Sequence, residues 1–240
     1  MKIEGRNAVS EAVKSGKTID RVLVKNGLRD DASQNLIKEI KNKGIKIHFA
    51  DKITLDKESF SGRHQGFIAF VSDFKYSEIE DILSSPKGEY PFIVVLDGVE
   101  DPHNLGSIIR VCECAGVDGL IIGKHRSAAV TDTVMRISEG SANHLKIAKA
   151  VNINSAIETL KKNGVWVYAV ELKGEDIYKS DLKGSLALVI GGEDTGVNKL
   201  TREKCDKTLT IPMFGKVNSL NASVACGVAV FEAVRQRIPE

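Results

Sequence analysis

The pattern of apolar and polar positions becomes regular from about residue 92 of this chain. Short apolar runs there alternate with segments in which apolar residues recur every three or four positions, which predicts strands alternating with helices. The expected strands span residues 92–96, 119–123, 145–149, 165–170, 186–190 and 208–211. The expected helices span residues 105–115, 131–137, 153–162, 200–205 and 219–237. Because the run at 92–96 is apolar throughout, it suits a strand covered on both faces, and the whole pattern predicts a parallel α/β sheet.

The part before residue 74 predicts a smaller α/β unit. Its expected helices span residues 7–15 and 32–43, and its expected strands span 20–25, 45–50 and 66–71. A short helix at 76–83 is followed by Ser, Pro and Gly residues at 84–88, a composition typical of linkers. We therefore expect a first domain over residues 1–73, a linker over 74–90 and a second domain over 91–240.

Composition narrows the class of protein. Of the 240 residues, 42% are hydrophobic and 28% are charged, which is typical of a soluble globular protein. The chain has no apolar run of about 18 residues and no apolar signal core at its start, so we expect a cytoplasmic protein without a membrane span. Its four cysteines lack the spacing of a zinc site, so we expect buried free thiols and no metal.

The net charge of +2 combines a slightly basic first domain with a slightly acidic second domain. A mildly basic surface permits contact with nucleic-acid phosphates but does not require it.

Two stretches of the second domain follow expected strands directly. Residues 96–106 place Asn104 where it fits the N-cap of the next helix, and Arg110 lies away from that helix's apolar stripe. Residues 189–196 combine three glycines with Glu193 and Asp194, but they lack the Gly-Lys-Ser/Thr of a phosphate loop and the spacing of a dinucleotide fingerprint. Acidic groups suit a ligand with hydroxyls or a cation such as a sulfonium. A capped helix and an ordinary glycine turn would explain the same residues.

A third stretch, residues 211–221, carries Gly, Lys, Asn and Ser into the start of the last expected helix. Ser219 is the expected N-cap of that helix. Small residues then recur on one face, which favours close packing: Ala222, Ala225, Cys226, Ala229 and Ala233. A plain strand–loop–helix connection fits equally well. The absence of a Gly-x-Ser-x-Gly elbow in the sequence argues against a hydrolase.

Two polar stretches stand out in the first domain. Glu4-Gly5-Arg6-Asn7 precedes the first expected helix, and Ser61-Gly62-Arg63-His64-Gln65-Gly66 precedes the last expected strand. A helix cap and a glycine-rich turn are the interpretations that the residues alone favour. Both stretches also offer side chains of the kind that bind RNA from loops.

Taken together and in this order, the three stretches of the second domain resemble the motifs of the SpoU (TrmH-like) family of RNA 2′-O-ribose methyltransferases, in the SPOUT superfamily. The resemblance covers about residues 91–237. Gly5-Arg6-Asn7-Ala8-Val9 and His64-Gln65-Gly66 further resemble the RlmB branch, which modifies a guanosine of 23S ribosomal RNA in the peptidyl-transferase region.

This resemblance implies a fold, a cofactor and partners. The first domain would resemble ribosomal protein L30e and bind RNA, and the parallel sheet of the second would contain a deep trefoil knot. S-adenosylmethionine would be the methyl donor, large-subunit ribosomal RNA the substrate and a homodimer the assembly, with no metal and no membrane.

The resemblance also implies roles for individual residues. The catalytic and RNA-handling set would be Asn104, Arg110, Glu193, Ser219 and Asn221. The cofactor would contact Gly191, Ile211, Met213 and Leu220. RNA would be bound by Arg6, Asn7, Arg63, His64 and Gln65.

Other functions compatible with the sequence are methylation of tRNA or of another rRNA site, such as the one that confers thiopeptide resistance, and RNA binding without catalysis. A nucleotide-dependent oxidoreductase would need the dinucleotide fingerprint that the sequence lacks.

Overall fold

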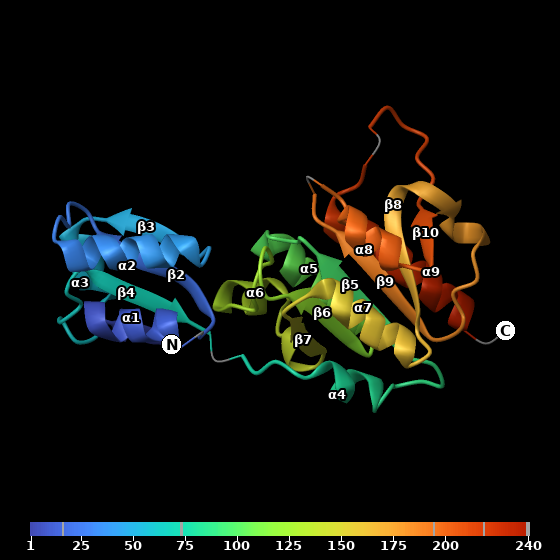
Figure 1. Cartoon of the computed structure of the whole chain (residues 1–240), viewed down its shortest axis with the longest axis horizontal. Coiled ribbons are helices and arrows are strands. Elements are labelled where there is room, and N and C mark those ends of the chain that lie inside the picture. Colours follow the sequence, from blue (N-terminus) through green and yellow to red (C-terminus); the bar gives the residue numbers. More distant parts are fainter. Residues whose placement is uncertain (16, 73, 194, 218, 239–240) are drawn as a thin grey trace. The chain divides into compact units, whose positions relative to one another are not determined.

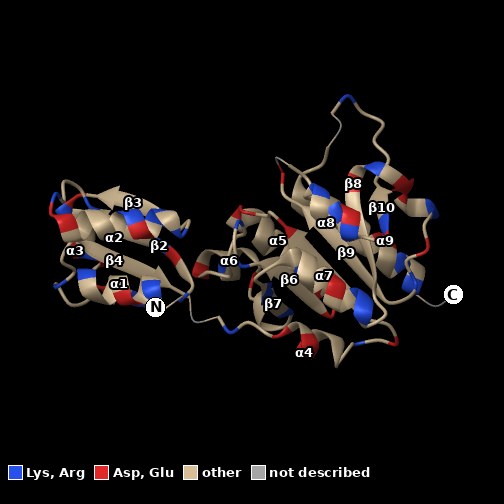
Figure 2. Cartoon of the chain, in the orientation of Figure 1, with Lys and Arg blue, Asp and Glu red and all other residues tan. Residues whose placement is uncertain are grey.

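A computed structural model describes residues 1–15, 17–72, 74–193, 195–217 and 219–238 (Figure 1). Asp194 and Asn218, which belong to the second and third stretches, lie outside the described residues. The chain divides into two compact units: Met1–Lys75 together with Ala129–Asp132, and Tyr76–Ala128 together with Thr133–Glu240. We refer to them as the N-terminal unit and the C-terminal unit. Figure 2 shows acidic and basic residues side by side along helices of both units.

The N-terminal unit contains a four-stranded sheet in the order β1-β4-β2-β3, in which β2 pairs parallel with β3 and antiparallel with β4. Its strands are β1 (Lys2–Glu4), β2 (Ile19–Lys25), β3 (Lys46–Ala50) and β4 (Phe67–Val71), and its helices are α1 (Arg6–Lys14), α2 (Asp31–Asn42) and α3 (Lys52–Glu58). Val22 and Val24 pack with α1 and α2, whereas Leu23 packs with Leu55 of α3. Because side chains alternate along a strand, the helices cover both faces of this sheet.

Two elements of this unit were not expected from the sequence. Strand β1 has only three residues, too few to show a period of two. Helix α3 buries only Leu55, and its other apolar residue, Ile53, is 65% exposed, so it lacks an apolar stripe. The start of α3 does carry a helix-capping signal, because the side chain of Asp51 accepts a hydrogen bond from the Thr54 backbone N–H at 2.8 Å.

The C-terminal unit contains a six-stranded, all-parallel sheet in the order β10-β8-β9-β5-β6-β7. Its strands are β5 (Phe92–Asp97), β6 (Gly119–Gly123), β7 (Lys146–Ala150), β8 (Trp166–Asp176), β9 (Leu186–Gly191) and β10 (Lys207–Thr210). The expected parallel sheet is confirmed. β5 and β9 are central, and every residue from Leu186 to Gly191 is buried. β8 runs six residues further than expected, and its polar end pairs with β10 after a shift in register.

Helices cover this sheet on both sides (Figure 1). They are α4 (Ile79–Leu83), α5 (Pro102–Cys114), α6 (Asp132–Ile137), α7 (Ile153–Lys162), α8 (Lys199–Lys204) and α9 (Ala222–Arg237), with 3₁₀ turns η1 (Ser141–Asn143) and η2 (Ile177–Lys179). Helix α5 packs against α9, and α7 packs against α8. None of the helices within the described ranges has the length and apolar content that a membrane crossing requires.

Helices α5 and α9, which follow the first and third stretches, begin at different residues from those expected. Helix α5 begins at Pro102 and is capped by Asp101, whose carboxylate accepts from the His103 backbone N–H at 3.0 Å, so Asn104 is not the N-cap. Helix α9 begins at Ala222 and is capped by Asn221 instead of Ser219. Both differences leave the polar side chains inside or directly before the first helical turn.

The small-residue face of α9 is packed as the sequence suggests. Ala222, Cys226, Ala229 and Ala233 are buried, and Ala225 is half-buried. Between α9 and α5, the thiols of Cys226 and Cys112 share a hydrogen bond. This hydrogen bond, together with burial, raises the pKa of Cys112. The expectation of buried thiols fails for Cys114, which is exposed, and for Cys205, which is only half-buried.

Candidate functional site

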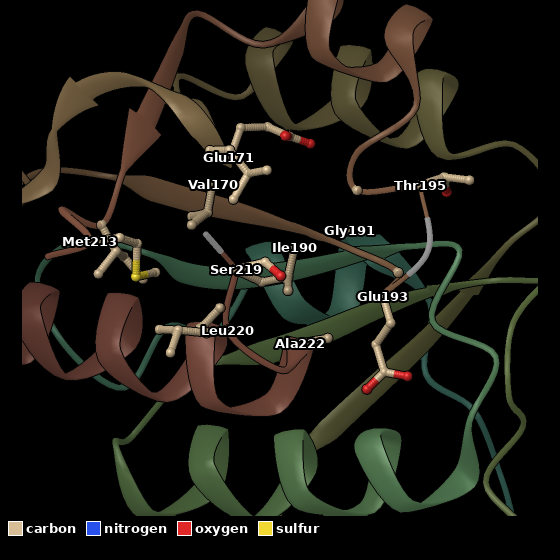
Figure 3. A pocket seen from close by; sticks show the side chains of 15 residues that line it. Val170, Glu171, Ile190, Gly191, Glu193, Thr195, Met213, Ser219, Leu220 and Ala222 are labelled. Carbon is tan, nitrogen blue, oxygen red and sulfur yellow. The ribbon is translucent and has the colours of Figure 1, made fainter. Parts of the chain in front are cut away.

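A cavity of about 340 Å³ opens at the carboxyl end of β9, where the pairing of β8 with β9 ends, and beside the start of α9 (Figure 3). It is lined by Val170, Glu171, Leu172, Ile190, Gly191, Gly192, Glu193, Thr195, Gly196, Ile211, Met213, Ser219, Leu220, Ala222 and Ala225. All four residues expected to contact a cofactor are among them, as are two of the expected catalytic residues, Glu193 and Ser219. Segments far apart in the sequence therefore meet at one pocket, at the strand ends where open α/β sheets bind ligands.

The glycines of the second stretch are required by backbone packing. A Cβ atom on Gly191 would lie 2.0 Å from the carbonyl carbon of Gly196, and one on Gly192 would lie 2.2 Å from the carbonyl oxygen of Gly98. The backbone N–H of Gly192 donates to the carbonyl of Asp97 at 3.0 Å. These contacts press the turn after β9 onto the loop after β5, and they leave no room for a side chain at either glycine.

Three polar side chains from the three stretches form one hydrogen-bonded group. The Asn104 amide donates to Glu193 Oε1 at 2.7 Å, and the Asn221 amide donates to the same oxygen at 2.5 Å. Asn221 Nδ2 also lies 2.9 Å from Asn104 Oδ1 and donates to it. Figure 3 shows Glu193 extending from the end of β9 toward the green helix α5. Two donors therefore fix one carboxylate oxygen, and Glu193 Oε2 makes no hydrogen bond within the described residues.

Asn221 also holds the start of α9. Its Oδ1 accepts from the backbone N–H of Ser223 at 2.9 Å and from the Ser223 hydroxyl at 2.6 Å. One side chain thus caps a helix with its oxygen and joins the polar group with its nitrogen.

Glu171 is a lining residue that the sequence did not indicate. It lies in the polar extension of β8, and its Oε1 accepts from the backbone N–H of Val197 at 2.5 Å. This contact joins positions 26 residues apart, and no local pattern in the sequence points to it. Glu171 of β8 and Glu193 of the turn after β9 give the pocket two carboxylates.

Arg110 lies apart from this group. Its guanidinium donates to Glu139 Oε1 at 2.7 Å, and half of its side chain is exposed. Arg110 follows Asn104 by six residues on α5, which places it on another side of the helix. Among the described residues of one chain, the polar group and Arg110 therefore do not meet.

The two polar stretches of the N-terminal unit do come together. The backbone N–H of Gly5 donates to Phe67 O at 3.0 Å, and the backbone N–H of Arg6 donates to Gln65 Oε1 at 3.2 Å. Asn7, Arg63 and Gln65 are exposed, and Arg6 is half-buried in an ion pair with Asp30. The loops therefore form one continuous polar surface.

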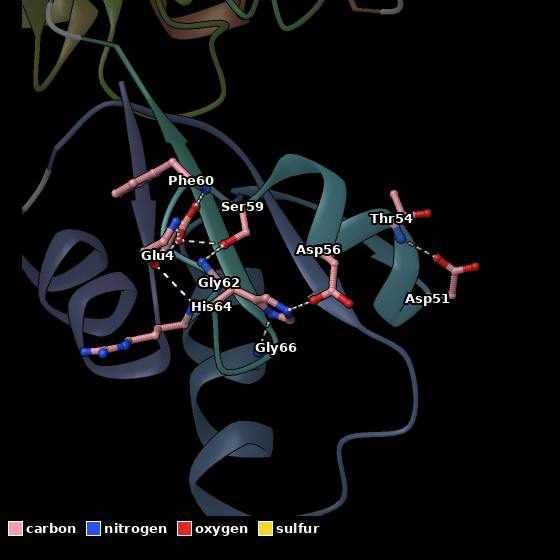
Figure 4. A network of polar contacts seen from close by, with 11 residues as sticks. Glu4, Asp51, Thr54, Asp56, Ser59, Phe60, Gly62, His64 and Gly66 are labelled. Atoms are coloured by element: carbon pink, nitrogen blue, oxygen red, sulfur yellow. Dashed lines mark hydrogen bonds and ion pairs between the residues drawn. The ribbon is translucent and has the colours of Figure 1, made fainter.

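Glu4 organises the chain next to this surface (Figure 4). Its carboxylate accepts from the Phe60 backbone N–H at 2.6 Å and from the hydroxyls of Ser59 and Ser61 at 2.9 Å and 2.5 Å. Burial alone would raise the pKa of Glu4, but these hydrogen bonds together lower it. The Phe60 side chain itself remains 74% exposed, and an exposed aromatic ring beside polar loops is a surface on which an RNA base can stack. Phe60 was not indicated by the sequence, because an isolated Phe carries no pattern.

His64 differs from the other expected RNA-binding residues because it is only 6% exposed. Its Nδ1 accepts from the Gly66 backbone N–H at 3.0 Å, so Nε2 carries the proton and donates to Asp56 Oδ1 at 2.9 Å (Figure 4). Because both ring nitrogens form hydrogen bonds inside the unit, His64 holds the loop in its conformation. Its ring nitrogens are therefore not available to bind RNA.

Comparison with protein families identifies the architecture. Residues 91–231 match the SpoU rRNA Methylase family, and residues 2–77 match the RNA 2′-O ribose methyltransferase substrate binding family. The chain belongs to the SpoU rRNA methylase family. The expected family and enzyme class are confirmed, and the N-terminal unit contains the substrate-binding domain found in RNA 2′-O-ribose methyltransferases.

Relatives of this SpoU protein extend over nearly its whole length. A Bacillus subtilis protein, YacO, named as a TrmH family tRNA/rRNA methyltransferase, is 38% identical over 238 residues, which cover 98% of this chain and 95% of that protein. The AdoMet-bound rRNA methyltransferase of Sinorhizobium meliloti is similar in structure, with a TM-score of 0.64 at 25% identity over 99% of this chain and 88% of that one. AviRb of Streptomyces viridochromogenes, a SpoU methyltransferase in complex with AdoMet, shares the fold with a TM-score of 0.64 at 24% identity, over 99% of this chain and 90% of its own.

Proposed function

We propose that this SpoU protein transfers a methyl group from S-adenosylmethionine to a ribose 2′-hydroxyl of RNA. The proposed substrate is a guanosine of 23S ribosomal RNA in the peptidyl-transferase region, as in the RlmB branch that residues 5–9 and 64–66 resemble. The proposed setting is the cytoplasm. The observation that carries the proposal is the convergence of the three stretches, in a SpoU family chain, on one pocket edged by the Asn104–Glu193–Asn221 group.

The residues of the pocket fit S-adenosylmethionine. Ile190, Ile211 and Leu220 offer an apolar wall for an adenine ring, and Gly191 and Gly192 line the pocket with backbone alone, which suits a planar group. Glu171 and Glu193 offer carboxylates for hydroxyls and for positive charge. When bound, the cofactor supplies an electrophilic methyl group that is already activated by its sulfonium. Gly191, Ile211, Met213 and Leu220 would hold it, in a C-terminal unit that we propose to be knotted.

The protein's own residues must orient the ribose and help its 2′-hydroxyl to lose a proton. Arginine remains protonated near neutral pH, so we assign Arg110 to stabilising the developing alkoxide charge and to holding the target phosphate. The Asn104–Glu193–Asn221 group would orient Arg110 or the ribose through the free lone pairs of Glu193. Ser219, at the pocket wall, would complete the geometry of the site.

A homodimer would reconcile the position of Arg110 with this role. Arg110 is exposed on α5 and does not contact the pocket of its own chain in the described residues. In the two-fold symmetric dimer that we propose, the exposed Arg110 of one subunit would lie at the pocket of the other. We therefore propose that each active site takes Arg110 from one subunit and the Asn104–Glu193–Asn221 group from the other.

The first prediction tests the reaction. Purified protein with labelled S-adenosylmethionine is expected to methylate protein-free large-subunit RNA, and mapping by RNase digestion and mass spectrometry is expected to place the methyl group on a ribose. An otherwise identical RNA with deoxyribose at the mapped nucleotide is expected to be inert. Methylation of the deoxy substrate would show that a base is modified, and transfer only to tRNA would contradict the proposed substrate.

The second prediction concerns Ala225, which lines the pocket on the small-residue face of α9. Leucine at this position adds three carbons to a close-packed wall, so Ala225→Leu is expected to lower cofactor affinity by about tenfold or more, or roughly 1.4 kcal/mol. It is also expected to weaken the dimer. Calorimetry and sedimentation measure the two effects, and Ala8→Leu, at an exposed position of α1, is the control. If neither quantity changes, α9 contributes only ordinary core packing.

A further inference from the structure

A basic loop follows β6 in the C-terminal unit. It consists of Lys124, His125, Arg126 and Ser127, and its first three side chains are exposed. Both of its ends are fixed by backbone hydrogen bonds: Lys124 N–H donates to Ala150 O at 2.7 Å, and Ala128 N–H donates to Val99 O at 2.8 Å. The loop is therefore held in place although it has no secondary structure of its own.

The basic loop lies at the same end of the sheet as the pocket. The turn after β9 contacts the loop after β5 through Gly192 and Gly98, and that loop in turn bonds to Ala128 through Val99. Strands β9, β5 and β6 are neighbours in the sheet, and all three connections follow their carboxyl ends. An RNA strand that enters the site along this edge would pass over the basic loop.

A half-buried lysine stands beside the loop. Lys149 of β7 pairs in register with Ile122 of β6, two residues before Lys124. Its ammonium lies 4.4 Å from the centre of the Tyr76 ring, which accounts for part of its burial. Burial lowers the pKa of Lys149, and repulsion by Lys124 lowers it further.

Among the described residues, none of Lys124, His125, Arg126 and Lys149 has a carboxylate within 4.0 Å, although many exposed lysines and arginines elsewhere do. Placing two lysines next to each other costs free energy unless an anion comes between them. A phosphate group supplies such an anion and several acceptor oxygens.

We propose that Lys124, Arg126 and Lys149 form a binding site for backbone phosphates of the RNA substrate. The site rests on the proposed function, and it deepens it by placing part of the RNA on the C-terminal unit. Phosphate contacts fix the position of an RNA without reading its sequence, so these residues position the target nucleotide at the pocket and take no part in the chemistry.

The test is the double variant K124Q/R126Q, which removes two exposed charges while keeping polar side chains of similar reach. RNA affinity, measured by filter binding across a salt series, is expected to fall roughly tenfold at low salt. The slope of log K against log salt is expected to shrink by about one to two units, as for the loss of one or two phosphate contacts. The control is K162Q/K183Q, with the same charge change at exposed lysines that precede β8 and β9, at the amino ends of the strands. It is expected to bind RNA as the wild type does.

Two further measurements separate this proposal from the proposed function. Calorimetry with S-adenosylmethionine is expected to give wild-type affinity for K124Q/R126Q, and methyl transfer is expected to show a raised KM for RNA with kcat nearly unchanged. Lys149→Met, which keeps the apolar stem against Tyr76, is expected to reproduce the smaller salt slope.

If both variants keep the wild-type affinity and slope, the phosphate site is refuted even when methyl transfer is normal. Absence of methyl transfer by the wild type would refute the proposed function, and the RNA-binding result could still be interpreted independently.

Discussion

Arg110→Ala is expected to lower methyl transfer to RNA by at least about a hundredfold, the usual effect of removing one group that stabilises developing charge. Cofactor affinity is expected to stay near the wild-type value, because Arg110 is not among the described residues that line the pocket of its own chain. Single-turnover kinetics and calorimetry measure the two effects. Because Arg110 is half-exposed and pairs, among the described residues, only with Glu139, the variant is expected to fold normally.

The matched control for Arg110→Ala is Glu139→Gln, which removes the ion pair but keeps the arginine. It is expected to retain most of the activity. Unchanged turnover in Arg110→Ala would overturn the role assigned to this residue.

Shared active sites can be tested by mixing two inactive proteins. Arg110→Ala and Glu193→Ala are each expected to be inactive as homodimers. After unfolding and refolding together, a mixed dimer would contain one site with both residues intact, so activity is expected to return. No recovery would show that Arg110 serves the pocket of its own subunit.

Gly191→Ala is expected to abolish cofactor binding and to destabilise the C-terminal unit by several kcal/mol. The added methyl group would lie 2.0 Å from the carbonyl carbon of Gly196 and 2.2 Å from the backbone N of Val197, so the turn after β9 must move. Moving it breaks the bond from Val197 to Glu171 and displaces two walls of the pocket. A strain of this kind is among the few mechanisms that give large effects from a single methyl group.

Gly184→Ala is the control for this variant, because a Cβ there meets no atom within 4 Å. Thermal unfolding and calorimetry are expected to show wild-type behaviour for Gly184→Ala and losses of both stability and binding for Gly191→Ala. If Gly191→Ala binds the cofactor normally, the turn is more adaptable than its close contacts imply.

The sheet could be predicted from the sequence because its strands are buried on both faces. Residues 92–96 and 186–190 read as unbroken apolar runs, and each observed strand exceeds its predicted range by a single residue. The residues at the strand ends were also visible, because polar and glycine residues directly after apolar runs break the pattern. The structure gathers Gly191, Glu193, Ile211 and Leu220 at one pocket, and their roles there stay predictions.

What the sequence did not indicate depends on contacts over long distances. Glu171 lies in a polar strand end that pairs with β10, and only the folded chain brings it to the turn at Val197. His64 appeared to be an exposed loop residue, but its bond to Asp56 of an unpredicted helix turns it inward. The helix starts were misplaced where several capping residues compete. Asp101-Pro102 was the stronger signal for α5, since proline is favoured at the first helical position.

The two roles of Asn221 have a consequence for engineering the protein. Aspartate caps helices as well as asparagine does, so Asn221→Asp would keep the start of α9 intact. It would also replace the two amide donors with a second carboxylate facing Glu193, which disrupts the polar group. A screen that selects variants by thermal stability alone would therefore retain a protein that has lost its activity. At this position stability and activity have to be measured separately.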